Sequence, residues 1–463
     1  MKIALDLDNT IINYANSFVS ACSLEGIDLP NHICSKQEIK NFIRNHDHYE
    51  WPMDWIKVQG RVYGEAILDA AVASEVLDIA EKFDVTIVSH KSEMSLCGRY
   101  NLREQAQIFL QSRGLGEVET IFLETLEEKI KYLSENSFDI IVDDLETVLD
   151  GVKSNAILLH YKGEDSNYLK VSNWEEVLLI FNEITDSKIE KLATHLIKYS
   201  KNHKKFILKG FRETSRLERE LYSLKYDFNP RHVEAIGKKF LIFKYEENLS
   251  PIYFDIEFKN RFIEIYKVLQ EDMENISFNA TDSALERLDY KKNIDRRMNY
   301  LDNSISKELE TLYGKILSKE KGDRKIEDVR TNICFPDFYR ENFYERDGSL
   351  LLMDFESFGR DDLSRTFLNA IHHFGHDINN REESVLIDLF TDLSIGDASF
   401  WKRVKLNFDL VAFEWLLIAS RREENLSKVR SLASIMSSNI EKNEEVVSWK
   451  KDIWWIIDDR LKS

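Results

Sequence analysis

Two acidic residues near the N-terminus have the types and spacing of a phosphate-handling site. Asp6 and Asp8 end the apolar segment KIALDLD, which is typical of a buried parallel strand, and Thr10 follows. Residues two apart in a strand face the same side of the sheet, so both carboxylates can reach one point. There, one acid can attack phosphorus while the other exchanges a proton with the leaving oxygen. A hard cation such as Mg²⁺ binds one or two such carboxylates together with substrate phosphate.

Further polar residues end two later strand-like segments. Asp143 and Asp144 end the segment FDIIVDD, and we expect them to complete the metal site. Ser89 lies at the end of DVTIVSH and can donate a hydrogen bond to a phosphate oxygen. Lys129 lies near the start of a predicted helix and can neutralise the developing charge, with Lys91 as the alternative cation.

The elements that must position these residues alternate between strands and helices. Strand-like runs lie at 84–90, 138–144 and 155–161, with helical patterns at 102–114 and 126–136 between them. This order, with the N-terminal strand, predicts a doubly wound parallel α/β sheet whose polar strand ends gather on one edge.

A helical insertion interrupts the strand rhythm. Residues 13 to about 65 contain the helix-like segments NYANSFVSACSLEG and SKQEIKNFIRNH. Because they fall between the first and second strands, we expect a small helical cap over the carboxyl edge of the sheet.

These segments resemble the four ordered motifs of the haloacid-dehalogenase-like hydrolases. The matching stretches are DLDNT, VSHKS, EEKI and VDDLETVL, and the match covers roughly residues 1–160. The resemblance implies a Rossmann-type fold and Mg²⁺-dependent hydrolysis of phosphate monoesters through an aspartyl-phosphate. The residue roles that it implies are nucleophile for Asp6, acid/base for Asp8, metal ligand for Asp143 or Asp144 together with Asp6 and Asp8, and phosphate ligand for Thr10, Ser89 and Lys129.

A second set of candidate residues lies more than 300 positions further on, in FPDFYREN and LLLMDFE. Asp337 precedes Asn342 by five residues, and Asp354 follows twelve residues later. In a kinase-like site the first Asp orients and deprotonates the acceptor hydroxyl, while the Asn and the second Asp hold Mg²⁺ against nucleotide phosphates. The dipeptide Asp347-Gly348 predicts a hairpin that returns Asp354 to the side of Asn342.

This region resembles the aminoglycoside phosphotransferase and choline kinase-like family. The resemblance extends through MDFESFGRDDLSR and covers roughly residues 190–460. It implies a two-lobed α+β protein-kinase-like fold, ATP and Mg²⁺ as cofactors, and a hydroxylated small molecule as acceptor. The resemblance implies that Asp337 is the catalytic base and that Asn342 and Asp354 are metal ligands. It implies that Lys209, in KFILK, binds the nucleotide phosphates and that Glu220 is the ion-pair partner of Lys209, with Glu218 as the alternative. The segment FLIFKYE would contact adenine.

The sequence departs from that family at three places. Phe335 stands where the family usually has His, and Pro336 stands where it has Gly. The segment 194–205 before the lysine strand contains no glycine, although a Gly-rich loop is expected there.

The segment 371–377, IHHFGHD, contains three histidines, for which we expect core packing rather than a zinc site.

Composition narrows the class of protein. The 463 residues carry a net charge of −19, which argues against nucleic acid or an anionic membrane as the main partner. The four cysteines are scattered, which is typical of reduced thiols in a cytosolic protein, and no apolar run is long enough for a membrane span.

Together these features predict two enzymes in one chain. We expect a phosphatase domain at 1–165, a linker or bridging helix at 166–188, and a kinase-like domain at 189–463. Since opposing reactions on the same phosphate would waste ATP, we expect different positions or successive intermediates of a sugar or polyol, and the resemblance loosely implies surface-polysaccharide precursors. The alternative hypothesis is a phosphatase regulated by a nucleotide-binding pseudokinase module.

Overall fold

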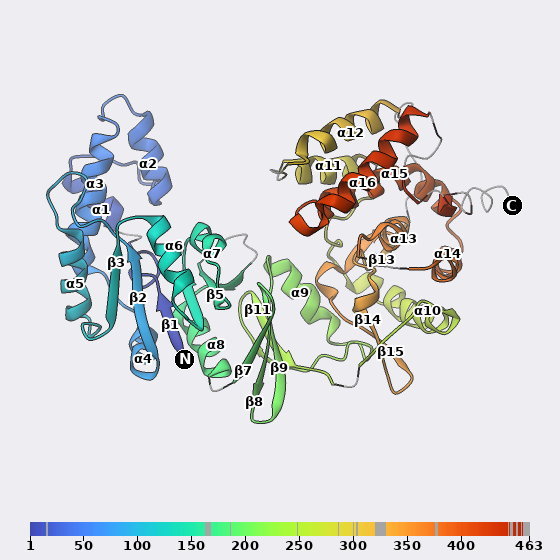
Figure 1. Cartoon of the computed structure of the whole chain (residues 1–463), viewed down its shortest axis with the longest axis horizontal. Helices are drawn as coiled ribbons and strands as arrows, with labels where there is room; N and C mark the ends of the chain where they lie inside the picture. The colour runs from blue at the N-terminus through green and yellow to red at the C-terminus, as the bar shows by residue number, and fades with distance from the viewer. Residues whose placement is uncertain are drawn as a thin grey trace. The chain divides into compact units, whose positions relative to one another are not determined.

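The chain forms two compact units in the computed structural model (Figure 1). The first unit comprises Met1–Thr214 and Arg231–Tyr245, and the second comprises Ser215–Pro230 and Glu246–Ser463. The residues that the structure describes are 1–14, 17–162, 168–185, 187–247, 249–285, 287–299, 301, 304–319, 330–375, 378–442, 444, 448–450, 452–454 and 456.

The first unit is built on a six-stranded sheet in which all neighbouring strands are parallel, in the order β3-β2-β1-β4-β5-β6. The predicted parallel α/β sheet is therefore confirmed. Two of its strands, β3 and β6, were not predicted from the sequence. The bounds are β1 Lys2–Leu5, β2 Asp84–His90, β3 Glu119–Leu123, β4 Ile140–Asp143, β5 Ile157–Tyr161 and β6 Leu169–Val171.

Helices follow the strands of this sheet and supply its apolar cover. The buried stripe is clearest in α8, where Val177, Ile180, Phe181 and Ile184 recur at helical spacing. The Asn173 side chain accepts the backbone N–H of Glu176 and so defines where α8 begins. The bounds are α4 Ser74–Lys82, α5 Leu102–Ser112, α6 Leu126–Glu135, α7 Glu146–Gly151 and α8 Trp174–Ile184.

A helical insertion lies between β1 and β2, within the segment where the sequence predicts one. It comprises α1 Ser17–Leu24, α2 Lys36–Asn45, α3 Met53–Gly64 and the short 3₁₀ turn η1 Ala66–Asp69. In Figure 1 its helices gather beyond the carboxyl ends of β1 and β2. A reciprocal capping box between Ser35 and Glu38 starts α2, and the buried Ile39 and Ile43 turn one face of that helix inward.

A second, five-stranded sheet completes the first unit, in the antiparallel order β10-β11-β9-β8-β7. Its apolar residues join the core of the parallel sheet, because α8 contacts β8 and β6 contacts β9. The sequence predicts domain boundaries at residues 165 and 189, whereas the first unit extends to Thr214 and includes Arg231–Tyr245. Which fragments fold alone stays a prediction. The bounds are β7 Lys188–Ala193, β8 Leu196–Lys201, β9 Lys204–Gly210, β10 Val233–Ile236 and β11 Phe240–Lys244.

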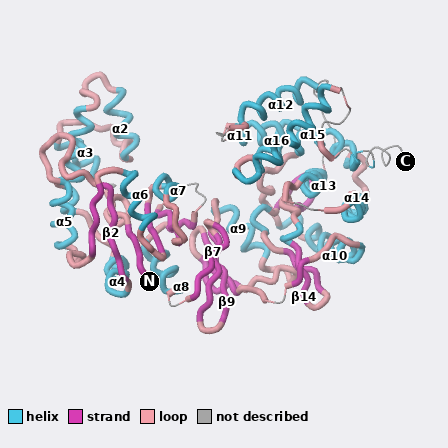
Figure 2. Tube along the Cα trace, in the orientation of Figure 1, coloured by secondary structure: helices cyan, strands magenta, loops and turns pink. Residues whose placement is uncertain are grey.

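The second unit is mainly helical, with short strands around the second set of candidate residues (Figure 2). The predicted hairpin is confirmed: β14 and β15 pair, and Asp347 and Gly348 have the positive φ angles, 51° and 77°, that its tight turn requires. The bounds are α9 Thr214–Ser223, β12 Ser250–Pro251, α10 Ile256–Glu271, η2 Met273–Asn275, α11 Arg287–Met298, α12 Ser306–Lys319, β13 Thr331–Cys334, η3 Arg340–Asn342, β14 Phe343–Arg346, β15 Ser349–Leu352, η4 Phe355–Ser357, β16 Gly359–Asp362, α13 Leu363–His372, α14 Asn380–Leu393, α15 Phe400–Ala419, η5 Glu423–Asn425 and α16 Leu426–Glu441. Among the described residues, no helix is long and apolar enough to cross a membrane.

Candidate active sites

The carboxyl ends of β1 and β4 bring Asp6 and Asp143 to one buried lysine. The Asp6 N–H donates to the Val142 carbonyl at 2.9 Å, which continues the strand pairing and sets the two acids side by side. Lys129 of α6 places its Nζ 2.5 Å from Asp6 Oδ1 and 2.7 Å from Asp143 Oδ2. At most 5% of any of these three residues is exposed, so their charges interact in a largely dry environment.

The loop after β1 adds Thr10 to this group. The Thr10 hydroxyl donates to Asp6 Oδ2 at 3.0 Å. The Trp174 indole N–H donates to the Thr10 carbonyl at 3.3 Å, so the first residue of α8 anchors the loop. Asn9 has a φ of 62°, a left-handed conformation that asparagine tolerates better than most residues, and the chain turns sharply there.

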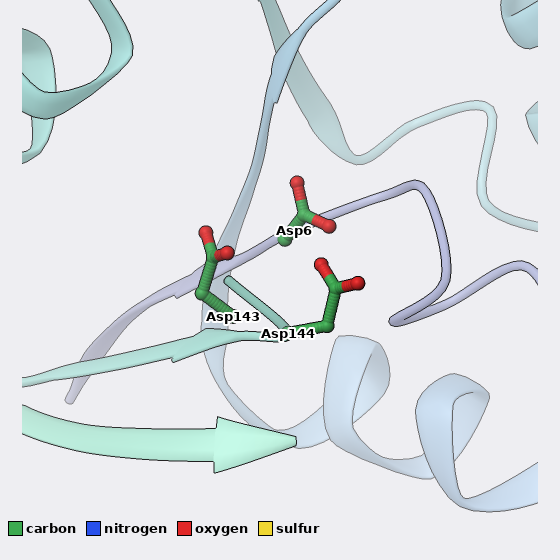
Figure 3. A group of neighbouring side chains, drawn as sticks. All are labelled: Asp6, Asp143 and Asp144. Carbon is green, nitrogen blue, oxygen red and sulfur yellow. The ribbon is translucent and has the colours of Figure 1, made fainter. Parts of the chain in front are cut away.

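Three carboxylates of this group have the arrangement of a cation site. Asp6, Asp143 and Asp144 each offer an oxygen, and these atoms lie within 4.8 Å of one another. Figure 3 shows the three side chains as neighbours. Burial raises the pKa of Asp6 to about 6 against the pull of Lys129. Burial and the charges of Asp6 and Asp143 raise the pKa of Asp144 to about 8. A divalent cation would relieve this repulsion, so the donor set fits Mg²⁺.

Asp8 lies outside that carboxylate group and has partners of its own. The Tyr14 hydroxyl donates to Asp8 Oδ1 at 2.6 Å, and Lys91 Nζ lies 2.7 Å from Asp8 Oδ2. Burial alone would raise the pKa of Asp8, but Lys91 and Tyr14 outweigh it and lower the pKa. The sequence offered Lys129 and Lys91 as alternatives. Both contact an aspartate of the candidate site, since Lys129 pairs with Asp6 and Lys91 with Asp8. The predicted metal-ligand role of Asp8 stays a prediction.

Ser89 is buried near the end of β2, the strand that pairs with β1. The pairing of β1 with β2 ends at Leu5 and Ile87, and Ser89 follows Ile87 by two residues. This places Ser89 at the same sheet edge as Asp6. Its predicted hydrogen bond to a phosphate oxygen stays a prediction.

In the second unit, the second set of candidate residues lines one small pocket. Its wall includes Asp337, Asn342 and Asp354, and it has room for about one water-sized sphere, ≈ 10 Å³. Asn342 Nδ2 donates to the Asp337 carbonyl at 3.0 Å, and the Met353 N–H donates to the Asn342 carbonyl at 2.9 Å. The hairpin therefore returns Asp354 to Asn342, as the sequence predicts.

His373, just after α13, lies beside Asp337 and was not predicted as a site residue. Its ring stacks on Tyr339 and packs on Trp415, with 4.3 Å between ring centroids in each case. The Gly375 N–H donates to His373 Nδ1 at 3.1 Å, so in the neutral ring Nε2 carries the proton. His373 Nε2 is 3.6 Å from Asp337 Oδ1, so this N–H faces the carboxylate. His372 is buried in the core, whereas His373 combines ring packing with this contact to Asp337.

Phe335 belongs to the aromatic core of the second unit. Its ring contacts those of Phe355 and Phe358, with 5.2 and 5.3 Å between centroids. An apolar side chain fits this position because its surroundings are aromatic.

The predicted nucleotide-binding pair is divided between the two units. Lys209 is buried in β9 of the first unit, with its Nζ 5.0 Å from the centre of the Phe211 ring. Glu220 is buried in α9 of the second unit, whereas its alternative Glu218 is exposed. Their pairing stays a prediction.

Of the known proteins compared with this chain, only solved structures match it, and they match in fold. No protein-family model matches the chain, and neither does a curated protein. The choline kinase LicA from Streptococcus pneumoniae is 15% identical, with 56% of this chain and 96% of that chain covered and a TM-score of 0.36. The ternary complex of APH(2")-IIa with streptomycin and ATP is 14% identical, with 60% and 99% covered and a TM-score of 0.39. Amicoumacin kinase hAmiN in complex with AMP-PNP, Ca²⁺ and Ami is 12% identical, with 58% and 93% covered and a TM-score of 0.41. Likenesses at this level carry no argument about function, which depends on the residues of the two sites.

Proposed function

We propose that the chain is a bifunctional enzyme of small-molecule phosphate chemistry. The first unit would hydrolyse a phosphate monoester, and the kinase-like residues would transfer phosphate from ATP to a hydroxyl group, with a sugar or polyol as the kind of acceptor. The observation that carries the first activity is the cluster of buried Asp6, Lys129 and Asp143 with the partly buried Asp144. The four-motif resemblance to haloacid-dehalogenase-like hydrolases agrees with it.

In this proposal Asp6 is the nucleophile. Its carboxylate attacks phosphorus, the bond from phosphorus to the leaving oxygen breaks, and that oxygen takes a proton from the Asp8–Lys91 pair. Water then attacks the phosphorus of the aspartyl-phosphate, returns a proton to that pair, and releases Asp6 and inorganic phosphate. Lys129, Thr10 and Ser89 would bind phosphate oxygens. Mg²⁺ held by Asp6 with Asp143 or Asp144 would neutralise phosphate charge.

The second activity depends on the pocket that Asp337, Asn342 and Asp354 line together. Asp337 would orient the acceptor hydroxyl and take its proton, while Asn342 and Asp354 would hold Mg²⁺ against the phosphates of ATP. Lys209 would bind those phosphates, with Glu220 as its partner. The partner molecules of the whole chain would thus be a phosphate ester and a hydroxylated acceptor.

The experiment compares two single variants with the wild-type chain. Hydrolysis of p-nitrophenyl phosphate with Mg²⁺ should fall by orders of magnitude in Asp6→Asn and stay unchanged in Asp337→Asn. ATP-dependent phosphorylation across a sugar and polyol panel should show the opposite pattern. A wild-type chain without hydrolysis would refute the phosphatase, and loss of both activities in one variant would refute two independent sites.

The second candidate function is a phosphatase with a nucleotide-binding pseudokinase module. Two observations favour it: Phe335 occupies an aromatic core, and the glycine-free segment 194–205 is taken up by the tight β8–β9 hairpin. ATP that raises the melting temperature but is never transferred to an acceptor would support this function over the kinase.

A further inference from the structure

The acid/base Asp8 indicates where the rest of the substrate must lie. In the proposed mechanism the leaving oxygen exchanges its proton with the Asp8–Lys91 pair, so the group attached to that oxygen would lie near the side chains around this pair. Two aromatic residues contact this pair: Tyr14, whose hydroxyl donates to Asp8, and Tyr63 of α3, whose ring faces Lys91. The two rings meet edge to face at 5.0 Å, and Lys91 Nζ lies 5.2 Å from the centre of the Tyr63 ring. The helical insertion thus supplies a wall of the leaving-group side.

Lys36 of α2 extends this wall with a positive charge. Its Nζ donates to the Tyr63 hydroxyl at 2.9 Å and lies 5.6 and 5.7 Å from the centres of the Tyr63 and Phe18 rings. Lys36 is an exposed residue, although neighbouring atoms partly desolvate its ammonium group. Within the described part of the chain, no carboxylate lies within 4 Å of Lys36 Nζ, whereas Lys91 has one such partner and Lys129 has two.

Lys36 lies close enough to two aspartates of the candidate site for their charges to act on it. Desolvation lowers the pKa of Lys36, while the negative charges of Asp144 and Asp8 act to raise it. Asp8 and Asp144 also act on Tyr63, whose pKa burial raises above its usual value. Lys36 and Tyr63 therefore lie within electrostatic range of the candidate catalytic site, on the side from which the leaving group departs.

We propose that Lys36, oriented by the Tyr63 hydroxyl, binds an anionic group on the leaving-group part of the phosphate ester. The substrate would then carry a carboxylate or a second phosphate in addition to the phosphate that is hydrolysed. This inference rests on the proposed phosphatase function and narrows its substrate class. An ammonium with a neutral phenol as partner can still take a charged ligand, and a charge-assisted hydrogen bond there discriminates strongly against an uncharged analogue.

The experiment measures kcat/KM of the full chain with Mg²⁺ on three esters of similar size. Glycerol phosphate has a neutral remainder, phosphoglycerate adds a carboxylate, and propanediol bisphosphate adds a second phosphate. Lys36→Met retains an unbranched apolar side chain of similar length and removes the charge that lies over Phe18. We expect this variant to lose about tenfold on one or both anionic esters and to change little on the neutral one. The anionic ester that loses activity identifies the group that Lys36 binds.

Lys40→Met, one turn further along α2, is the matched control and should retain the wild-type preference. Calorimetric binding of phosphoglycerate and glycerol phosphate to Asp6→Asn, with and without Lys36→Met, gives a second readout that needs no turnover. Equal losses on all three esters, or no loss on the anionic ones, would overturn this proposal while leaving the phosphatase intact. A wild-type chain that hydrolyses none of these esters nor p-nitrophenyl phosphate would overturn the phosphatase itself, and this proposal with it.

Discussion

Replacing Lys129 with methionine should destabilise the first unit in a pH-dependent way. Lys129→Met keeps the length and apolar stem of the side chain but removes the ammonium that bridges Asp6 and Asp143. Removing one partner of a buried ion pair costs about 3–5 kcal/mol, because the remaining charge stays buried without compensation. Two carboxylates lose their common partner here, so we expect a loss in that range near neutral pH.

The pH dependence follows from Asp6. Its pKa in the folded chain is about 6, above the unfolded value of 3.8, so its contribution to stability is complete below the unfolded value and is lost as the pH rises through about 6. Lys129 acts to lower that pKa, and without it the folded pKa rises further. The destabilisation of Lys129→Met relative to wild type should therefore be larger at about pH 8 than at about pH 5.

The assay is urea unfolding followed by hydrogen exchange of peptides from β1 and β4, which reports on the first unit alone. Lys131→Met on the same helix is the control, because that side chain is 72% exposed and should change stability by no more than about 0.5 kcal/mol. Equal effects of the two substitutions, or a Lys129→Met penalty that shrinks as the pH rises, would refute the reasoning about the buried cluster.

Three further predictions concern cations and the second unit. Mg²⁺ at about a hundredfold its Kd should stabilise the first unit by about 2.7 kcal/mol in thermal unfolding, and Asp144→Asn should weaken that effect; no shift with Mg²⁺ would exclude the metal site. Asp354→Ala should weaken Mg-ATP binding in calorimetry, whereas Asp337→Ala should spare binding and reduce transfer by about 10²–10⁴-fold; a wild-type chain that binds neither ATP nor GTP would exclude the kinase. His373→Leu should reduce phosphate transfer by about tenfold without changing nucleotide binding. His373→Gln can place an amide donor toward Asp337 and should recover part of the transfer rate. Equal losses of transfer in both variants would exclude an orienting role for His373.

The sequence predicts best those elements whose local pattern is unambiguous. The predicted strand 84–90 and helix 174–184 agree with β2 and α8 at both ends, because one is a short β-branched run between polar ends and the other has a clear capping asparagine. Strands β7 and β8 were missed. In β7, KIEKLA, exposed and half-buried residues alternate with no buried position, so the segment shows no apolar run.

Candidate site residues were predictable where they end strands and not where tertiary packing brings them in. Asp6, Asp143 and Asp144 could be anticipated because the carboxyl ends of parallel strands meet at one edge. The contact between Lys36 and Tyr63 joins two helices of the insertion, and that between His373 and Asp337 spans 36 residues. Neither pair lies in a motif with a recognisable spacing, so their proximity depends on how helices pack.

The most direct test of the account is to identify the residue that becomes phosphorylated during turnover. The full chain is mixed with phosphoglycerate and Mg²⁺, quenched in acid within one turnover, digested and analysed by mass spectrometry. The account predicts one phosphoryl group on Asp6, in the peptide that contains β1, and none there in Asp6→Asn. Turnover in Asp6→Asn at the wild-type rate, or a phosphoryl group on any other residue of the first unit, would contradict it.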